Sequence, residues 1–430
     1  MHVIRVHRCF AGGGWAALAF SDRLMNGFEM IGSDEARRRI LESVPVLDAE
    51  WVRYPEAVGR ILRRSIIADR PLPPYDRVMM DGIAVNSGGG APAGAAWALE
   101  GMAAAGEPLK RLRGRTGAIE VMTGAVLPEG CDTVIPVEWL DMENGCARLE
   151  PGKTVEPGKF IHREGSDFPR GAVLVEAGRA ILAKDLAVAV SCGRTQLEVT
   201  RRARVALVST GDELVDPDAV PESHQMRRSN SLALDALVRG CGLGETTLEH
   251  LPDDREVQEG ELARLIEGHD VVVLSGGVSK GKKDFLPEVL RRLRVEEVFH
   301  RVAQRPGKPF WFGMHPGGVP VFGFPGNPLS TLVGGHVYLL PALRQLMGER
   351  VKAPETLPLG SPYDFSPPLT LFLPVVREIN PATGERRGLP HPVQNSGDYA
   401  SVVETDGFLE LPAERERFDA GIPYPFYPWE

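Results

Sequence analysis

Cysteine is scarce in this sequence, and no long apolar run occurs. The five cysteines lie far apart and form no Cys-x-x-Cys pair, which argues against a disulfide framework and against a zinc site. No segment reaches the ~20 consecutive apolar residues of a membrane-spanning helix, so we expect no membrane association. Reduced thiols fit a cytoplasmic location best.

Basic residues are not in excess either. The 49 basic and 58 acidic side chains give a formal net charge of −9. General nucleic-acid binders need a basic surface, so we expect no nucleic-acid partner. A small anionic ligand remains compatible with this charge, because a few local cations are enough to hold it.

Residues 1–29 form a segment of unusual composition, with basic residues followed by a short apolar stretch. Two interpretations stay open, namely a weak signal peptide and an extension upstream of a start at Met30. The second is favoured, because glycines interrupt the apolar stretch and no good small-residue cleavage site follows it.

The rest of the chain is long enough for several folding units, since domains cluster near ~100–150 residues. Residues 30–72, predicted to be helical from Ser33 and again from Pro55 to Ile67, form domain I with residues 169–200. Residues 73–168 alternate β-like pieces with turns and predict a β-rich domain II, with a loop at 90–105. Residues 348–430 predict a C-terminal β-barrel, domain IV.

Residues 201–347 show the most regular pattern. Apolar strands such as RVALVST and DVVVLSGG alternate with amphipathic helices such as DREVQEGELARLIEGH. This alternation predicts an α/β domain III around a doubly wound, mostly parallel sheet. Such sheets bind ligands at the carboxyl ends of their strands.

Several loops at those strand ends carry residues suited to anions. Ser275, Gly276 and Gly277 form a turn whose backbone amides can face an oxyanion, because glycine allows close approach. Such a turn alone is more often only structural. The cations in or near these loops strengthen the anion hypothesis; they are Lys280, Lys282, Lys283, Arg305 and Lys308.

Four acidic residues are candidates for metal chemistry: Asp81, Glu213, Asp253 and Asp284. Carboxylates near a phosphate-binding loop favour Mg²⁺, which prefers oxygen ligands and can polarise a scissile bond. Each acid also has a structural interpretation. Asp253 is a candidate N-cap for the following helix, and the Asp81-Gly82 pair is typical of a tight turn.

Six segments together are similar to one known family. They are PPYDRVMMDGIAV, MTGAVLPEGCDTVIPVE, VALVSTGDEL, SGGVSKGKKDF, RPGKPF and GFPGNPLST. In this order they resemble the molybdopterin molybdenumtransferases, the family of MoeA and of the E domain of gephyrin. The resemblance extends from about residue 30 to residue 430.

The resemblance implies a four-domain homodimer whose domain III is similar to the molybdopterin-binding fold of molybdopterin adenylyltransferase, a potential contact partner. It implies a transferase that takes adenylylated molybdopterin and molybdate, releases AMP and inserts molybdenum into the dithiolene. A divalent cation, usually Mg²⁺, is implied as cofactor.

The same resemblance assigns roles to single residues. The catalytic positions are Asp81, Thr123, Glu213 and Asp284, of which Asp81, Glu213 and Asp284 are implied metal ligands. The implied substrate-binding positions are Asp253, Ser275, Gly276, Gly277, Arg305, Lys308, Pro325 and Pro328.

The sequence departs from the family pattern in four places. Arg77 stands in YDRV where FDNS is common, Ser166 in GSD where GED is common, and Arg227 in the unusual QMRRSN stretch. Arg305 replaces the first lysine of KPGKP, which keeps the charge but changes its geometry. These departures bear on substrate detail, whereas the charges needed for catalysis remain.

Three other functions stay open. A nucleotide-cleaving enzyme of the competence-damage type shares the domain fold but lacks the MMDG and MTGA segments. A scaffold like gephyrin would carry a fused adenylyltransferase domain and a long linker. A non-catalytic or divergent pterin-binding paralogue is the strongest rival. The choice between molybdate and tungstate, and the recipient molybdoenzyme, are also open.

Overall fold

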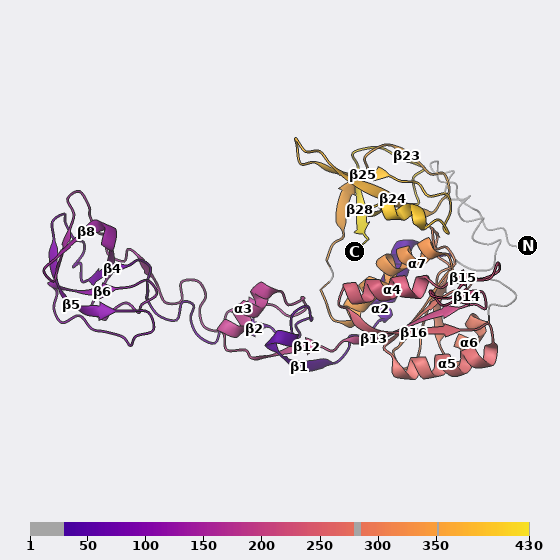
Figure 1. Ribbon diagram of the computed structural model, residues 1–430, viewed down its shortest axis with the longest axis horizontal. Helices are drawn as coiled ribbons and strands as arrows, with labels where there is room; N and C mark the ends of the chain where they lie inside the picture. The colour runs from indigo at the N-terminus through magenta and orange to yellow at the C-terminus, as the bar shows by residue number, and fades with distance from the viewer. Residues whose placement is uncertain (1–29, 279–284, 351, 430) are drawn as a thin grey trace, which may run out of the picture.

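The computed structural model of the protein describes residues 30–278, 285–350 and 352–429. The segment 1–29, and Asp284 with Lys280, Lys282 and Lys283, lie outside the described residues. Figure 1 shows a distal β unit (residues 77–162) at one end and a connecting unit (49–67 and 173–200) in the middle. A central α/β unit (203–346) and a C-terminal β unit (355–428) pack together at the other end.

The distal β unit contains a six-stranded sheet of order β7-β4-β6-β5-β9-β8. Its strands are β4 (Gly82–Val85), β5 (Ala96–Ala103), β6 (Gly117–Val121), β7 (Thr133–Pro136), β8 (Leu140–Glu143) and β9 (Cys146–Leu149). The loop prediction for residues 90–105 is wrong, because β5 lies inside this sheet, parallel to β6. Its alanines and glycine have low strand propensity, and pairing on both sides overrides it.

The connecting unit pairs β1 (Ala49–Arg53) with β12 (Gln196–Thr200) and β2 (Ile66–Ile67) with β11 (Val173–Val175). Helix α3 (Ala183–Ser191) lies where AILAKDLAVAVSCG predicts it. The predicted helix from Pro55 to Ile67 is wrong. Only a short 3-10 turn, Tyr54–Glu56, forms there, because Ile61 and Leu62 form β-bridges with residues 180 and 199.

The central α/β unit is built on a sheet of order β16-β13-β17-β21-β20-β18. Strands β13 (Ala203–Thr210), β16 (Gly244–Leu251), β17 (Val271–Ser275) and β21 (Pro320–Phe324) run parallel. Strand β20 (Trp311–Met314) pairs antiparallel with β21 on one side and with β18 (Glu296–His300) on the other. The sheet is therefore mixed, with a parallel part that carries the predicted loops.

Helices cover both faces of this sheet. The helices are α4 (Asn230–Gly240), α5 (Arg255–Gly268), α6 (Leu286–Arg292), α7 (Pro328–Gly334) and α8 (Leu340–Leu346). Helices α4, α7 and α8 bury one apolar cluster, whereas α5 and α6 bury a second one on the opposite face. Two such layers on a parallel core leave the carboxyl ends of the strands open for loops.

The C-terminal β unit forms a curved sheet of order β19-β24-β26-β28-β22, with β25 also paired to β24. Its strands are β19 (Gln304–Arg305), β22 (Glu355–Pro358), β24 (Thr370–Ile379), β25 (Arg386–Pro390), β26 (Gly407–Leu411) and β28 (Pro423–Pro428). A bridge between Leu359 and Gly388 joins the two ends of this sheet. Strand β19 belongs in sequence to the central unit, so the two units share backbone pairing.

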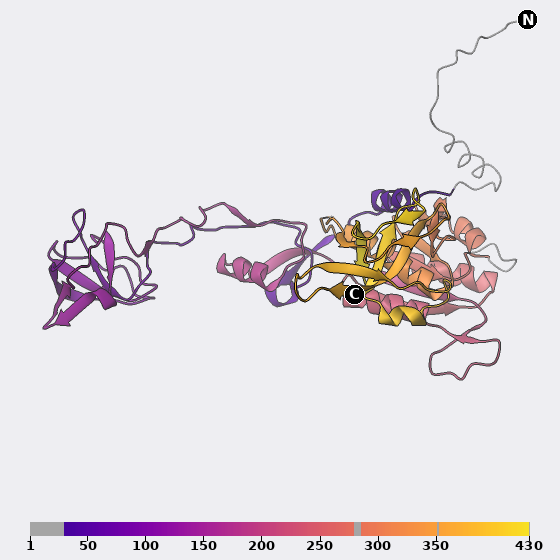
Figure 2. The same ribbon diagram turned by 90° about the horizontal axis from the view of Figure 1, so that it is seen from above.

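Helix α2 (Ser33–Ser43) opens the described chain and starts at the predicted Ser33. It buries Ala36 and Ile40 in the same apolar cluster as α8 and residues of the C-terminal unit, and not in the cluster of the connecting unit. Figure 2 shows this indigo helix lying against the central and C-terminal units. Among the described helices, none is long and apolar enough to span a membrane.

Candidate functional site

The carboxyl ends of β13, β17 and β21 form one edge of the central unit. Asn230, the first residue of α4, links two of the loops there. Its amide nitrogen donates to the Ser275 hydroxyl and to the Gly326 carbonyl, at 2.8 Å each. The structure therefore brings Ser275 and the Pro325–Pro328 loop together, as the parallel sheet predicts.

Gly276 and Gly277 form the turn after β17, with φ angles of 101° and 66°. A Cβ atom on Gly276 would lie 2.7 Å from the carbonyl oxygen of Thr210, so only glycine fits this close approach. The Gly276 amide donates to the Phe324 carbonyl at 3.0 Å. This amide is therefore used inside the sheet edge and is not a donor for an anion.

The acids at this edge are placed by β13 and β16. Glu213 and Asp212 are exposed just after β13, and Asp212 accepts a hydrogen bond from the Asp253 amide at 3.0 Å. The cap of α5 is Asp254, which accepts from Val257, so the interpretation of Asp253 as N-cap is wrong by one residue. Among the described residues, no three His, Cys, Asp or Glu side chains gather as metal ligands do.

The loop from Arg305 to Lys308 follows β19 and exposes both cationic side chains. Hydrogen bonds from the buried residues Val302 and Gln304 fix the backbone of this loop. Val302 donates its amide to the Lys308 carbonyl at 3.0 Å, and the buried Gln304 side chain donates to the Pro306 carbonyl at 3.0 Å. The buried Tyr338 hydroxyl donates in turn to Gln304. Two exposed cationic side chains thus stand on a backbone that hydrogen bonds hold in place.

A cavity of about 430 Å³ separates this loop from the C-terminal unit. Its lining combines cationic, amide, hydroxyl and aromatic groups, among them Arg305, Lys308, Pro325, Asn327, Phe365 and Ser396. The guanidinium of Arg305 lies 5.9 Å from the centre of the Phe365 ring, and Asn327 donates to the Ser396 hydroxyl at 2.7 Å. Pro328 begins α7 between the lining residues Asn327 and Leu329.

Sequence reasoning missed several of these residues. Asn230 could have been found from the Ser-Asn pair that opens a helix between two strand-end loops. Phe365 and Ser396 carry no such signal, because they lie on irregular segments of the C-terminal unit. Only the packing of that unit against the Arg305–Lys308 loop brings them to the cavity.

Asp81 and Thr123 form a second cluster, in the distal β unit. The Thr123 amide and hydroxyl both donate to one Asp81 carboxylate oxygen, at 2.7 and 2.8 Å. These two hydrogen bonds, the backbone one first, lower the pKa of the exposed Asp81 carboxyl. Met79, Met80 and Met122 are exposed beside it. The turn is thus polar at its centre and apolar around it.

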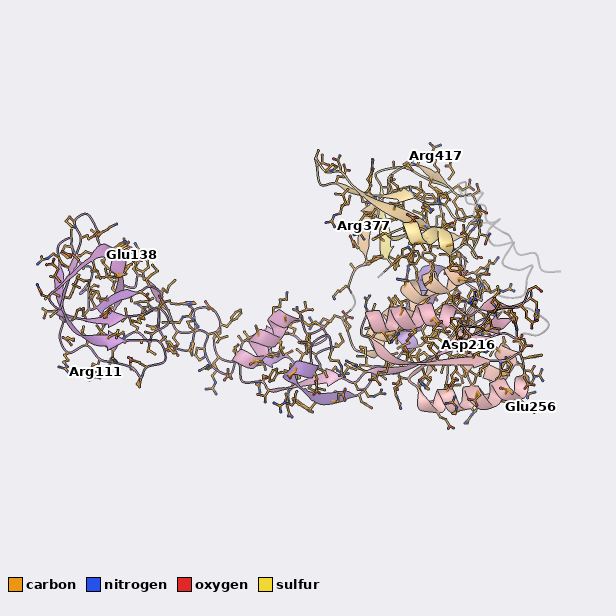
Figure 3. The ribbon with its side chains drawn as sticks, in the orientation of Figure 1. Arg111, Glu138, Asp216, Glu256, Arg377 and Arg417 are labelled. Atoms are coloured by element: carbon orange, nitrogen blue, oxygen red, sulfur yellow. The ribbon has the colours of Figure 1, made fainter. Side chains whose placement is uncertain are left out.

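The two clusters do not meet within one chain. Strands β4 and β6, which Asp81 and Thr123 adjoin, lie at the opposite end of the molecule from β13 and β16 (Figure 1). Glu138 and Asp216, labelled in Figure 3, mark the two separate units. Asp81 and Glu213 therefore do not share a metal site in a single chain, whereas Ser275, Pro325, Arg305 and Lys308 do lie in one region.

Three of the four positions that depart from the family pattern lie away from the cavity. Arg77 donates to His162 at 3.0 Å in the segment that leads into the distal unit, and Ser166 is exposed on the returning segment. Arg227, on β15 (Met226–Arg227), donates to the Ala219 carbonyl at 3.1 Å. Of the four, only Arg305 lines the cavity.

Two family descriptions match the chain. The MoeA N-terminal region (domain I and II) matches residues 31–193, and the probable molybdopterin binding domain matches residues 206–345. A protein from Synechocystis sp. named molybdopterin molybdenumtransferase is 38% identical over 91% of this chain and 99% of its own length. One of the same name from Synechococcus elongatus is 33% identical over 89% of this chain and 93% of its own.

Solved structures agree with these relatives. The crystal structure of a molybdopterin biosynthesis MoeA protein from Pyrococcus horikoshii superposes with a TM-score of 0.78 at 28% identity. The match covers 94% of this chain and 100% of that one. The same multidomain α/β architecture with mixed sheets is therefore present in a protein that has diverged considerably in sequence.

Proposed function

The chain belongs to the molybdopterin molybdenumtransferase family, and we propose that it transfers molybdenum from molybdate into adenylylated molybdopterin with release of AMP. It thereby acts in molybdenum cofactor biosynthesis. The resemblance seen in the sequence is confirmed by relatives over nearly the whole chain. These relatives do not favour the alternative of a non-catalytic paralogue.

The observation that carries this proposal is the arrangement at the carboxyl edge of the central sheet. Arg305 and Lys308 face a cavity of about 430 Å³, beside loops that Asn230 ties together. Cations on a fixed backbone suit phosphate groups or an oxyanion, because little conformational entropy is lost when the anion binds. We assign pyrophosphate or pterin phosphate binding to Arg305 and Lys308.

Asp81 is proposed as the residue that acts on the reacting atoms. A water oxygen forms a bond to the adenylyl phosphorus while the P–O bond to the pterin phosphate breaks, so that AMP leaves, the phosphate stays on the pterin, and a proton passes to solvent. A carboxylate kept ionised by two hydrogen bonds from Thr123 can orient the attacking oxygen. Glu213 and Asp253 lie at the edge of the central sheet, where the substrate phosphates would be.

A homodimer reconciles the two clusters. We propose that the distal β unit of one chain completes the site at the central unit of the other, which brings Asp81 to the cavity. The exposed Met79, Met80 and Met122 around Asp81 suit such a contact, because methionine packs well against irregular surfaces.

Contact with molybdopterin adenylyltransferase, which supplies the substrate, and a cytoplasmic location belong to the same proposal.

A divalent cation stays a prediction. The described residues of one chain hold no cluster of three His, Cys, Asp or Glu ligands. The family resemblance alone implies Mg²⁺, through Asp81, Glu213 and Asp284.

The test is functional. The gene is expressed in a host that lacks its own insertase, and molybdoenzyme activity is measured. Purified protein is then given adenylylated molybdopterin and molybdate, and AMP release is followed. Restored activity with molybdate-dependent AMP release supports the proposal. Pterin binding without AMP release would instead identify a divergent paralogue.

A further inference from the structure

A partly buried charged network lies where helix α2 meets the C-terminal β unit. The Arg37 guanidinium donates to both oxygens of Glu410 at 2.8 Å and to the Tyr427 hydroxyl at 2.8 Å, and Tyr427 also donates to Glu410 at 2.8 Å. The Ser33 hydroxyl donates to Glu410 at 3.2 Å. The side chain of Glu410 is only 9% exposed.

Stability alone does not explain this network. Removing two charges from water costs several kcal/mol per ion, so a buried pair is often no more stable than apolar side chains of similar size. What a bidentate pair adds is geometry, because a guanidinium and a carboxylate bind in a fixed relative orientation. The network therefore fixes the position of α2 relative to β26 and β28.

Backbone hydrogen bonds connect this junction to the Arg305–Lys308 loop. The Thr370 amide donates to the Ala303 carbonyl at 2.9 Å, and the Ala303 amide donates to the Ile31 carbonyl at 2.8 Å. The Ser33 and Thr370 hydroxyls lie 3.1 Å apart. Residue 303, which lies two residues before Arg305, is therefore hydrogen-bonded on one side to the chain that enters α2 and on the other to β24.

We infer that Arg37, Glu410 and Tyr427 are positioning residues for the anion-binding cavity. They hold the C-terminal unit at a fixed separation from the Arg305–Lys308 loop, and that separation sets the affinity for the phosphate groups of adenylylated molybdopterin. None of the three lines the cavity or touches substrate. This inference rests on the proposed function, because it assumes that the cavity binds an anion.

The decisive variant replaces the charged pair by apolar side chains, as Arg37→Met with Glu410→Met in the full-length protein. The matched control is Arg387→Met with Glu378→Met, an exposed ion pair on the β24–β25 hairpin of the same unit. Melting temperature, kcat and the KM for adenylylated molybdopterin are measured for each. We expect an unchanged or raised melting temperature, kcat within about two-fold, and a KM raised about ten-fold. The control should match wild type.

A folded double variant with a wild-type KM would overturn the inference. If the double variant does not fold, Tyr427→Phe removes only one hydroxyl and should raise the KM about two- to three-fold, roughly the effect of one hydrogen bond. A folded Tyr427→Phe with wild-type KM also overturns it.

Hydrogen exchange separates this inference from the proposed function. In the double variant, the amides of Val302, Ala303 and Thr370 should exchange faster than in wild type, without any substrate present. If wild type itself shows no molybdate-dependent AMP release, the proposed function fails, and the exchange result still decides whether the network positions the loop. Unchanged exchange at all three amides would contradict that role.

Discussion

The turn around Asp81 and the edge around Ser275 are built in different ways. The turn is local and exposed, and the Asp81 side chain has Thr123 as its hydrogen-bond partner in the described structure. The edge is assembled from β17, β21 and α4, whose side chains and amides cross-link one another. The turn presents one charged side chain, whereas the edge is a cross-linked backbone with a fixed conformation. We therefore expect mutations in the two regions to affect binding and chemistry separately.

Replacing Asp81 by Asn should have the largest effect. Asn keeps the size and the turn propensity of Asp but removes its charge. AMP release should fall about 100-fold or more, as expected for a lost acid–base group, while calorimetry shows normal binding of adenylylated molybdopterin. Asp141→Asn, an exposed aspartate on β8, is the matched control. AMP release near the wild-type rate would make Asp81 a turn residue only.

A mixed dimer tests whether the two regions cooperate between chains. Chains carrying Asp81→Asn are combined with chains carrying Lys308→Ala, and AMP release is measured at a substrate concentration well below the wild-type KM, where each parent variant retains little activity. If the site is shared across a two-fold interface, one of the two sites in each heterodimer is intact, so about half of the wild-type activity should return. The heterodimers are verified by two affinity tags. Activity no higher than that of the parents would show that each site is complete within one chain.

Replacing Arg305 or Lys308 by Ala should weaken binding and leave the fold intact. Both side chains are exposed, so the melting temperature should hardly change. Losing one charge-assisted hydrogen bond should weaken binding of adenylylated molybdopterin about 10- to 100-fold. Calorimetry gives the affinity, and Lys352→Ala, an exposed lysine outside the cavity, is the control. Unchanged affinity in both variants would refute the assignment.

The smallest effect is expected from Thr123→Val. Thr123 lowers the Asp81 pKa through its amide and then its hydroxyl, and valine removes only the hydroxyl. A depressed pKa keeps the carboxylate ionised as the pH falls, so losing one donor raises the pKa. The acid limb of the profile of kcat/KM against pH should shift to higher pH, with little change near pH 8. An unshifted limb would mean that Asp81 is not the titrating group.

The sequence predicts the central unit well because its apolar residues recur at the regular spacings of strands and helices. Helix α5 and strands β13, β16 and β17 occur where alternation places them, since each element buries its own apolar face. The prediction from sequence is wrong at residues 55–67 and 90–105. There, Ile61, Leu62 and the small residues of β5 adopt their conformation by β-pairing with residues far along the chain. Local patterns contain no information about such partners.

The candidate site residues also fall into those that local sequence predicts and those that it does not. Ser275, Arg305 and Pro325 follow recognisable strands, so they could be placed at one edge from the sequence. Asp81 could be linked to them only through the family resemblance, because it adjoins a different sheet. Phe365 and Ser396 reach the cavity through packing between units, which no motif encodes.

The position of helix α2 has a consequence for synthesis on the ribosome. Arg37 emerges early, yet its partner Glu410 lies 373 residues later. At ~5–20 residues per second, translation takes roughly 20 to 75 seconds to cover that separation. During this interval the apolar side of α2, with Ala36 and Ile40, lacks the part of its core that Phe372, Val402 and Phe408 supply. We therefore expect this side of α2 to stay incompletely covered on the nascent chain until the C-terminal unit has been made.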